Sequence, residues 1–297
     1  MLQPLSGWLP LILFSAFCLG FYDLCKKHAV RDNPIMPVLF LATLCGSTFF
    51  VLGTIAAGKL GEVLFCGPRI GLFVLAKSLL VAASWSCVYY AMRELPISIA
   101  APIRATAPLW TFLGSLILFR EIPTIWQGVA MLVIFAGYYL FSVIGKHEGI
   151  NFRQNRGAHM IVLGTLLGSV SALYDKFLLG TLAIPREMMQ FHFSVDLVVI
   201  LGIAWLLNWK FGHSTRTFHW RWSIPATGIL LIVADWLYFY ALSLPDTQVS
   251  ILSLLRRCSC VVTFTAGCAC FHDRNVKVKA AALAAILAGV VLLALAK

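Results

Sequence analysis

Two arginines within apolar stretches of the sequence have the clearest capacity for chemistry. Arg104 and Arg256 lie 152 positions apart, in segments of similar pattern. A guanidinium group offers a planar fork of donors that suits a carboxylate or a phosphate. On a helix, Arg104 shares a stripe with Thr111, and Arg256 shares a stripe with Thr263. These residues are candidates for binding a substrate, and pairing of each arginine with a buried aspartate is the structural alternative.

Three aspartates and one lysine are candidates for ion pairing or for coupling to protons. Asp23 and Asp175 are also 152 positions apart. Both lie near the ends of their apolar stretches, so a place at the membrane interface is an alternative for them. Asp235 lies midway along its stretch, and we expect it to carry a proton or to neutralise Arg256. Lys77, in the third stretch, is the remaining candidate.

Aromatic side chains deep in the apolar stretches are candidates for stacking on a substrate. Trp85 lies in the third stretch, and Tyr238 lies close to Asp235 in the eighth. Packing between helices is the alternative for both rings. Arg257 follows Arg256 directly and points elsewhere on a continuous helix. We therefore expect Arg257 to lie outside the site.

No motif indicates a metal, a cofactor or an enzyme. The closely spaced cysteines, Cys258 with Cys260 and Cys268 with Cys270, point to nearly opposite sides of a helix and cannot hold one metal ion. The sequence shows no zinc-protease motif, no nucleophile elbow and no glycine-rich phosphate loop. We expect neither catalysis nor a bound cofactor.

The composition places these residues in a membrane. The chain has 297 residues, of which 60% are hydrophobic and 12% are charged, and its mean hydropathy is +0.88. A soluble domain is about 45–50% apolar and about 25% charged. The net charge of +11 is explained by basic loops, which accompany membrane insertion. No basic helix free of apolar surface remains to bind nucleic acid.

Ten stretches are long and apolar enough to be transmembrane helices. A helix of about 20 apolar residues crosses the hydrocarbon core. The fold class we predict is an all-α integral membrane protein with about ten transmembrane helices. The expected helices cover residues 8–27, 36–57, 70–91, 98–119, 124–144, 158–181, 188–208, 224–243, 248–271 and 278–296.

The last five expected helices repeat the first five. Most matched residues are 152 positions apart, and the separation slips by two or three around the third and eighth helices. The matches include Tyr22-Asp23 with Tyr174-Asp175, Ser98 with Ser250, Phe119 with Phe271, Gly137 with Gly289, and Tyr90-Ala91 with Tyr240-Ala241. The sequence therefore predicts two repeat units, over residues 1–145 and 157–297.

Two units of five helices must be inverted relative to each other. Because five is odd, the second unit starts on the opposite side of the membrane from the first. Inverted repeats are typical of secondary transporters, whose substrate sites lie near the midplane between the repeats. The pseudo-twofold axis would bring Arg104 and Arg256 to the same depth, facing a common interior.

Proline, acidic and glycine positions in the fourth and fifth helices resemble a known family. The pattern is a helix with a mid-span proline, an acidic turn, and a helix with spaced glycines. The residues are Pro108, Glu121, Gly128 and Gly137, echoed by Asp273, Ala280 and Gly289. With the two five-helix units, this pattern resembles the EamA-like branch of the drug/metabolite transporter superfamily.

The resemblance implies ten helices around a central cavity, alternating access, and transport of amino acids, nucleotide sugars, drugs or other metabolites. It names no single cargo and no universal binding motif. It also implies that both termini lie in the cytoplasm. The loops on the opposite side hold most of the lysines and arginines outside the expected helices. The positive-inside rule therefore favours the reverse orientation, and the side of the termini stays open.

We predict a secondary active transporter in a bacterial inner membrane, coupled to protons, that moves a small anionic or zwitterionic metabolite. The aspartates leave export of cationic or amphipathic drug-like compounds as an alternative. A passive channel or facilitator and a non-transporting scaffold are further alternatives. The expected partners are the substrate, protons and the lipid bilayer, and the sequence indicates no oligomeric state.

Overall fold

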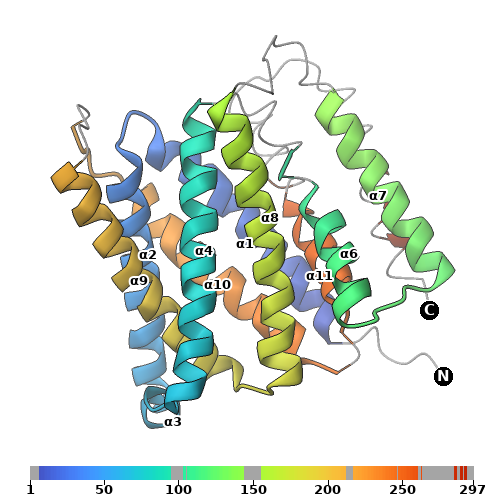
Figure 1. Ribbon diagram of the computed structural model, residues 1–297, viewed down its shortest axis with the longest axis horizontal. Coiled ribbons are helices and arrows are strands. Elements are labelled where there is room, and N and C mark those ends of the chain that lie inside the picture. Colours follow the sequence, from blue (N-terminus) through green and yellow to red (C-terminus); the bar gives the residue numbers. More distant parts are fainter. Residues whose placement is uncertain are drawn as a thin grey trace.

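The structure is a computed structural model in which every regular element is a helix, within the residues that it describes. These are residues 7–94, 103–104, 106–143, 155–211, 217–245, 247–259, 262, 284–285, 288–289 and 291–292. The helices (Figure 1) are α1 (Trp8–Val30), α2 (Ile35–Ala56), α3 (Leu60–Leu64), α4 (Pro68–Glu94), α6 (Ala107–Leu118), α7 (Ile125–Val143), α8 (Arg156–Lys176), η1 (Phe177–Thr181), α9 (Arg186–Phe211), α10 (Ser223–Ser243) and α11 (Val249–Arg256).

Six of these helices are long and apolar enough to cross a membrane. They are α1, α2, α4, α8 with η1, α9 and α10, and they correspond to the first, second, third, sixth, seventh and eighth expected helices. The expected fourth helix appears as α6, which begins at Ala107 with Pro108 in its first turn. The expected ninth helix appears in part as α11. Most of the expected tenth helix, 278–296, lies outside the described residues.

Local sequence explains where several helices begin. Asn155 caps α8 by accepting a hydrogen bond from the backbone N–H of Ala158 at 3.1 Å, which satisfies one of the free donors of the first turn. Pro34 precedes α2, and Pro68 is the first residue of α4. Proline suits these places because it has no backbone N–H to leave unpaired.

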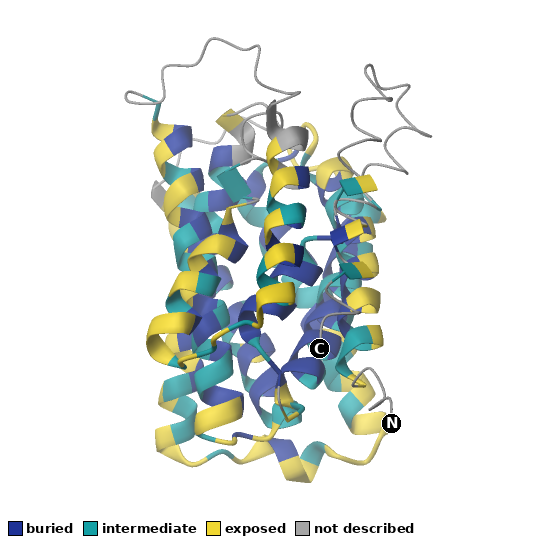
Figure 2. Ribbon diagram, turned by 90° about the vertical axis from the view of Figure 1, so that its right-hand side faces the viewer, coloured by how far each residue is buried: buried dark blue, intermediate teal, exposed yellow. Residues whose placement is uncertain are grey.

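Apolar side chains cover the outer surface of the helices. Figure 2 shows exposed residues along the outward faces and buried residues toward the middle of the bundle. Large apolar residues such as Phe14, Leu52, Ile117 and Leu132 lie on those outward faces and are exposed. A surface of this kind is stable against lipid and unstable against water.

The most extensive helix contacts are unchanged when the two halves are exchanged. Helix α1 packs on α10 and α4 packs on α8; α2 packs on α10 and α9 packs on α4; α6 packs on α8 and α11 packs on α1. The matched helices are α1 with α8, α2 with α9, α4 with α10, and α6 with α11. Exchange of matched helices turns α1–α10 into α4–α8, α2–α10 into α4–α9, and α6–α8 into α1–α11. The pairs α2–α9 and α6–α11 each map onto themselves.

One serine hydrogen bond joins each of the α1–α10 and α4–α8 pairs, with the donor on α1 in the first and on α4 in the second. The hydroxyl of Ser15 on α1 donates to the carbonyl oxygen of Ala234 on α10 at 2.7 Å. The hydroxyl of Ser84 on α4 donates to the carbonyl oxygen of Gly164 on α8, also at 2.7 Å. Small residues at these crossings let the backbones approach closely enough for such bonds.

The backbones of helices α2 and α10 approach each other closely at Gly46 and Gly228. A Cβ atom at Gly46 would lie 2.5 Å from the carbonyl oxygen of Gly228. A Cβ atom at Gly228 would overlap the carbonyl oxygen of Ala42. Backbone atoms cannot rotate away as a flexible side chain can, so only glycine fits on either side of this contact.

Replacement of Gly46 by alanine is expected to destabilise the protein by about 1–3 kcal/mol, because the added methyl group must push α2 away from α10. Gly53→Ala is the matched control, since Gly53 lies on the same helix and a Cβ atom there meets nothing within 4 Å. Thermal unfolding of both variants in detergent measures the difference. Equal midpoints for the two variants would contradict the close approach.

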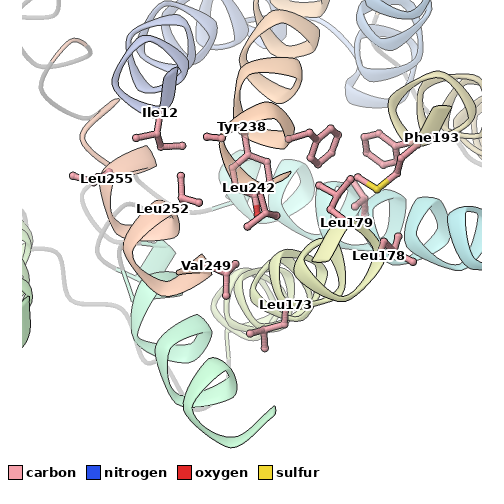
Figure 3. Close-up of a cluster of buried hydrophobic side chains, with 14 of the residues drawn as sticks. Ile12, Leu173, Leu178, Leu179, Phe193, Tyr238, Leu242, Val249, Leu252 and Leu255 are labelled. Carbon is pink, nitrogen blue, oxygen red and sulfur yellow. The ribbon is translucent and has the colours of Figure 1, made fainter. Parts of the chain in front are cut away.

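An apolar core joins both halves of the chain. Figure 3 shows Ile12 of α1 beside Leu252 of α11, with Tyr238 of α10 close by, and Leu173 of α8 near Val249 at the other end of α11. These side chains belong to one cluster of buried residues. Burial of this surface fixes the helices that surround the central cavity described below.

The acidic turn between α6 and α7 fastens the first half to the second. Glu121 accepts hydrogen bonds from the backbone N–H of Val249 at 3.3 Å and from the hydroxyl of Ser250 at 3.4 Å. Its carboxylate also lies 3.9 Å from the ammonium group of Lys176. A carboxylate is stabilised at a helix N-terminus, so Glu121 holds the start of α11 in place.

Candidate functional site

A polar cavity lies in the middle of the helix bundle. Its volume is about 200 Å³, and helices α1, α4, α6, α8, α9, α10 and α11 contribute to its wall. A single water molecule needs roughly 10–15 Å³ by a similar measure. The cavity therefore has room for several waters or for a small solute.

Nine of the ten site residues expected from the sequence line this cavity. They come from both halves of the chain, as expected for a site between two repeats. The nine are Asp23, Lys77, Trp85, Arg104, Thr111, Asp175, Asp235, Tyr238 and Arg256. Thr263 lies outside the described residues.

Lys77 and Asp175 form a buried ion pair between α4 and α8. The ammonium group of Lys77 donates to the carboxylate of Asp175, and the two side chains are 2% and 6% exposed. The ammonium nitrogen also lies 4.2 Å from the ring centroid of Phe193 and 4.8 Å from that of Phe239. Cation–π attraction adds to the ion pair in such a place. From the sequence alone, no carboxylate in the second half of the chain was predicted to pair with Lys77.

Arg256 pairs with Asp235, one of the two roles that the sequence suggested for Asp235. A guanidinium NH₂ group donates to the carboxylate, and both side chains are largely buried. The guanidinium carbon lies 4.4 Å from the ring centroid of Tyr238. Arg256 therefore has both a counter-ion and an aromatic ring on which it stacks.

Asp23 pairs with Lys26 on the same face of α1. The two charged groups are 2.5 Å apart, three residues along the helix. The ammonium group also lies 4.4 Å from the ring centroid of Tyr22 and 5.8 Å from that of Tyr89. The hydroxyl groups of these two tyrosines are 3.4 Å apart. Two phenolic groups and an ion pair thus form one side of the cavity.

Arg104 lies just before α6 and differs from Arg256. Among the residues that the structure describes, no carboxylate lies within 4.0 Å of its guanidinium group and no hydrogen bond to it is formed. Thr111, further along the wall, donates to the carbonyl oxygen of Ala107 at 3.1 Å and accepts from the hydroxyl of Ser253 at 3.4 Å. That second bond joins α6 to α11.

One expectation about the site needs correction. Arg257 was expected to face away, but it lines the cavity. Helix α11 ends at Arg256 and the chain turns at Arg257, so the angular spacing of a continuous helix does not apply there. Asp23 and Asp175 both line the cavity, although an interfacial place was the alternative for each.

Sequence reasoning missed Lys26, Tyr22 and Tyr89. Lys26 is buried and lines the cavity, and its spacing of three residues from Asp23 was a signal for a pair on one helix face. Both tyrosines line the cavity as well. The sequence distinguished Tyr22 only as the neighbour of Asp23 in a repeated pair, and it did not distinguish Tyr89 from the other aromatic residues of the apolar stretches.

Positive charge exceeds negative charge in the wall of the cavity. The described lining residues include five lysines and arginines and three aspartates. The electric field inside a cavity enclosed by a protein of low dielectric constant is only weakly screened by solvent. An excess of cationic groups in such a place attracts anions.

Comparison with known proteins identifies similarity at two levels. The model of the EamA-like transporter family matches residues 6–143. One solved structure, described only as the crystal structure of a protein, superposes with a TM-score of 0.76 over 95% of this chain and 94% of its own. Its sequence is 17% identical, so the likeness concerns the fold alone. A comparison with curated proteins finds no match.

Proposed function

Since the model of the EamA-like transporter family matches residues 6–143, we propose that the chain is a member of this family, within the drug/metabolite transporter superfamily, and a secondary active transporter of a small anionic or zwitterionic metabolite. Members of this superfamily are transporters rather than enzymes. The chain is a multi-pass membrane protein, with six described helices long enough to span the bilayer. The membrane that we propose for it is the inner membrane of a bacterium.

The central cavity is the observation that carries this proposal. It lies between helices of both halves, it has room for a small solute, and its wall has more cations than carboxylates. A structural ion-pair network needs no such space, because well-packed groups stabilise one another without a cavity. A substrate site in a transporter requires both the space and the charges.

The architecture that we propose is ten helices in two inverted units, over residues 1–145 and 157–297. The packing pattern supports it, because exchange of matched helices turns the most extensive helix contacts into one another. In such a fold the substrate binds at the pseudo-twofold axis, and the two units rock so that the cavity opens first to one side and then to the other.

In this mechanism cationic and polar groups hold the substrate while a carboxylate carries a proton. We assign substrate contact to Arg104 and Arg256, with Thr111, Thr263, Trp85 and Tyr238 as further wall residues. Asp235 is the proposed proton carrier, with Asp175 as a second candidate; Asp23 and Lys77 complete the ion pairs. Release of Arg256 by protonation of Asp235 would link proton binding to the charge that the substrate meets.

Reconstitution into proteoliposomes tests the function directly. The purified chain is expected to accumulate a small anion or zwitterion above its outside concentration when a proton gradient is imposed. Loss of uptake in both Arg104→Ala and Arg256→Ala would support the assigned site. Uptake that only equilibrates across the bilayer would indicate a passive channel or facilitator instead.

Replacement of Asp235 by asparagine is expected to remove the acceleration of uptake by a proton gradient, because the amide cannot gain and lose a proton. Uptake driven by the substrate gradient alone should continue at a lower rate. Initial rates measured with and without a pH step report both quantities. If Asp235→Asn kept the full effect of the pH step, the coupling role would be wrong.

A further inference from the structure

The two halves of the cavity differ at several matched positions, and one of these differences concerns the two arginines. Tyr90 matches Tyr240 at a separation of 150 positions, and the same separation relates Trp85 on α4 to Asp235 on α10. Trp85 and Asp235 both line the central cavity and the smaller pocket beside it. One half therefore has an indole ring where the other half has a carboxylate.

This difference accounts for the counter-ion that Arg256 has and that Arg104 lacks within the part of the chain that the structure describes. Asp235 pairs with Arg256. Within the described residues, Arg104 has no carboxylate within 4.0 Å, although it interacts with Asp23 at longer range. A guanidinium at this depth is stable only with a partner or with water in the cavity. An anion from solution can act as the counter-ion of Arg104, as Asp235 does for Arg256.

The aspartates of the cavity are already occupied by cations of the protein. Their partners are Lys26 for Asp23, Lys77 for Asp175 and Arg256 for Asp235. An ammonium group on a substrate would have to displace one of these cations. Even with Arg257 left aside, the lining cations outnumber the carboxylates by four to three, and Arg104 is the additional cation.

From this asymmetry we propose that the substrate is an organic anion without an ammonium group, and that its anionic group binds at Arg104 while Asp235 holds Arg256. This inference rests on the proposed function and narrows it to one substrate class and one side of the cavity. Arg104 offers a bidentate fork for a carboxylate or a phosphate monoester. Tyr22 and Tyr89 lie near enough to interact with Arg104 and supply hydroxyl donors to the same anion.

Thermal unfolding of the full chain in detergent, with four probes of one carbon skeleton, tests the proposal. Glycerate is an anion, glycerol 3-phosphate is a dianion, serine is a zwitterion and serinol is a cation. Binding to the folded state raises the unfolding midpoint. We expect a rise with glycerate or glycerol 3-phosphate and none with serine or serinol. A rise with serine or serinol alone, or no rise with either anion, overturns the proposal.

Variants locate the anion within the cavity. Arg104→Gln is expected to lower the affinity for the anion at least about tenfold, the equivalent of one lost charge-assisted contact. Arg104→Lys is expected to lower that affinity less. Arg69→Gln is the matched control, because Arg69 is exposed at the start of α4 and should leave binding unchanged. An Arg104→Gln protein that binds the anion as well as Arg69→Gln overturns the proposal.

The midpoint of the ligand-free variants gives a second readout that does not depend on the probe. Arg256→Gln leaves Asp235 without its partner and should lower that midpoint, whereas Arg104→Gln removes an uncompensated charge and should leave it unchanged or raise it. The opposite order overturns the proposal. If the anion binds at Arg104 but is not taken up into proteoliposomes, the proposed function is wrong and the anion site still stands.

Discussion

Replacement of Lys77 by methionine is expected to destabilise the folded protein by about 3–5 kcal/mol, the range found when one partner of a buried ion pair is removed. Asp175 would be left as a 6% exposed carboxylate with no cation against it. The rings of Phe193 and Phe239 cannot replace the lost ammonium group, because an aromatic face repels a carboxylate as it attracts a cation.

The double variant Lys77→Met/Asp175→Asn separates the charge from the packing. Removal of both charges is expected to recover most of the lost stability, since a neutral pair carries no uncompensated charge. Lys59→Met is the control, because Lys59 is exposed in the loop before α3. Denaturant or thermal unfolding in detergent measures all three variants. An equal loss in Lys77→Met and Lys59→Met would show that the pair contributes nothing to the fold.

Replacement of Trp85 by aspartate is expected to reduce anion uptake by at least about 100-fold. The new carboxylate would occupy the position that Asp235 occupies in the other half, and it would neutralise Arg104 from within the protein. Like charges placed side by side in a binding site cost several kcal/mol, and each 1.4 kcal/mol corresponds to a factor of ten. The anion would then meet a cavity with as many carboxylates as cations, Arg257 aside.

Trp85→Asn is the control for loss of the ring, because it removes the indole without adding charge. We expect Trp85→Asn to reduce uptake far less than Trp85→Asp, and we expect added Arg104→Gln to make little further difference in the aspartate variant. Initial rates of uptake of the anion that raises the unfolding midpoint most are the measurement. Equal rates in the two Trp85 variants would mean that charge at this position does not govern the substrate.

The sequence predicted the membrane class and the residues of the site better than it predicted their partners. Apolar stretches of sufficient length identify transmembrane helices because the bilayer imposes that length. The same stretches contain the charged residues Lys77, Arg104, Asp175 and Asp235. A charge within a membrane costs free energy, so such residues are candidates for a functional site. The structure places all four in the wall of one cavity.

The partners required the tertiary structure. Lys77 and Asp175 are 98 positions apart in the sequence, and only the packing of α4 on α8 brings them together. In the sequence, Lys27 lies one turn from Asp23, and Lys176 is next to Asp175. The structure pairs Asp23 with Lys26, and it turns Lys176 toward the carbonyl oxygen of Thr247. Proximity along a helix is a weak guide when another helix offers a counter-ion.

The asymmetry of the cavity was hidden for a different reason. The matched arginines suggested a symmetric site, because duplication places equal residues at equal depth. The difference lies at Trp85 and Asp235, which no longer resemble each other, so a search for matches passes over it. Divergence at a matched position becomes visible only when the structure shows that Asp235 pairs with Arg256 and that both positions line the same cavity.

Accessibility of the cavity from the two sides of the membrane tests the central claim most directly, namely that this cavity is the path of a transported solute. Ala172 on α8 lines the cavity and is half-buried, so Ala172→Cys in a chain with its nine native cysteines replaced introduces one small reporter. A membrane-impermeant maleimide is then applied to either face of oriented vesicles. The account predicts labelling from both faces, slowed by the anion that binds at Arg104. Labelling from one face only, or from neither, would contradict it.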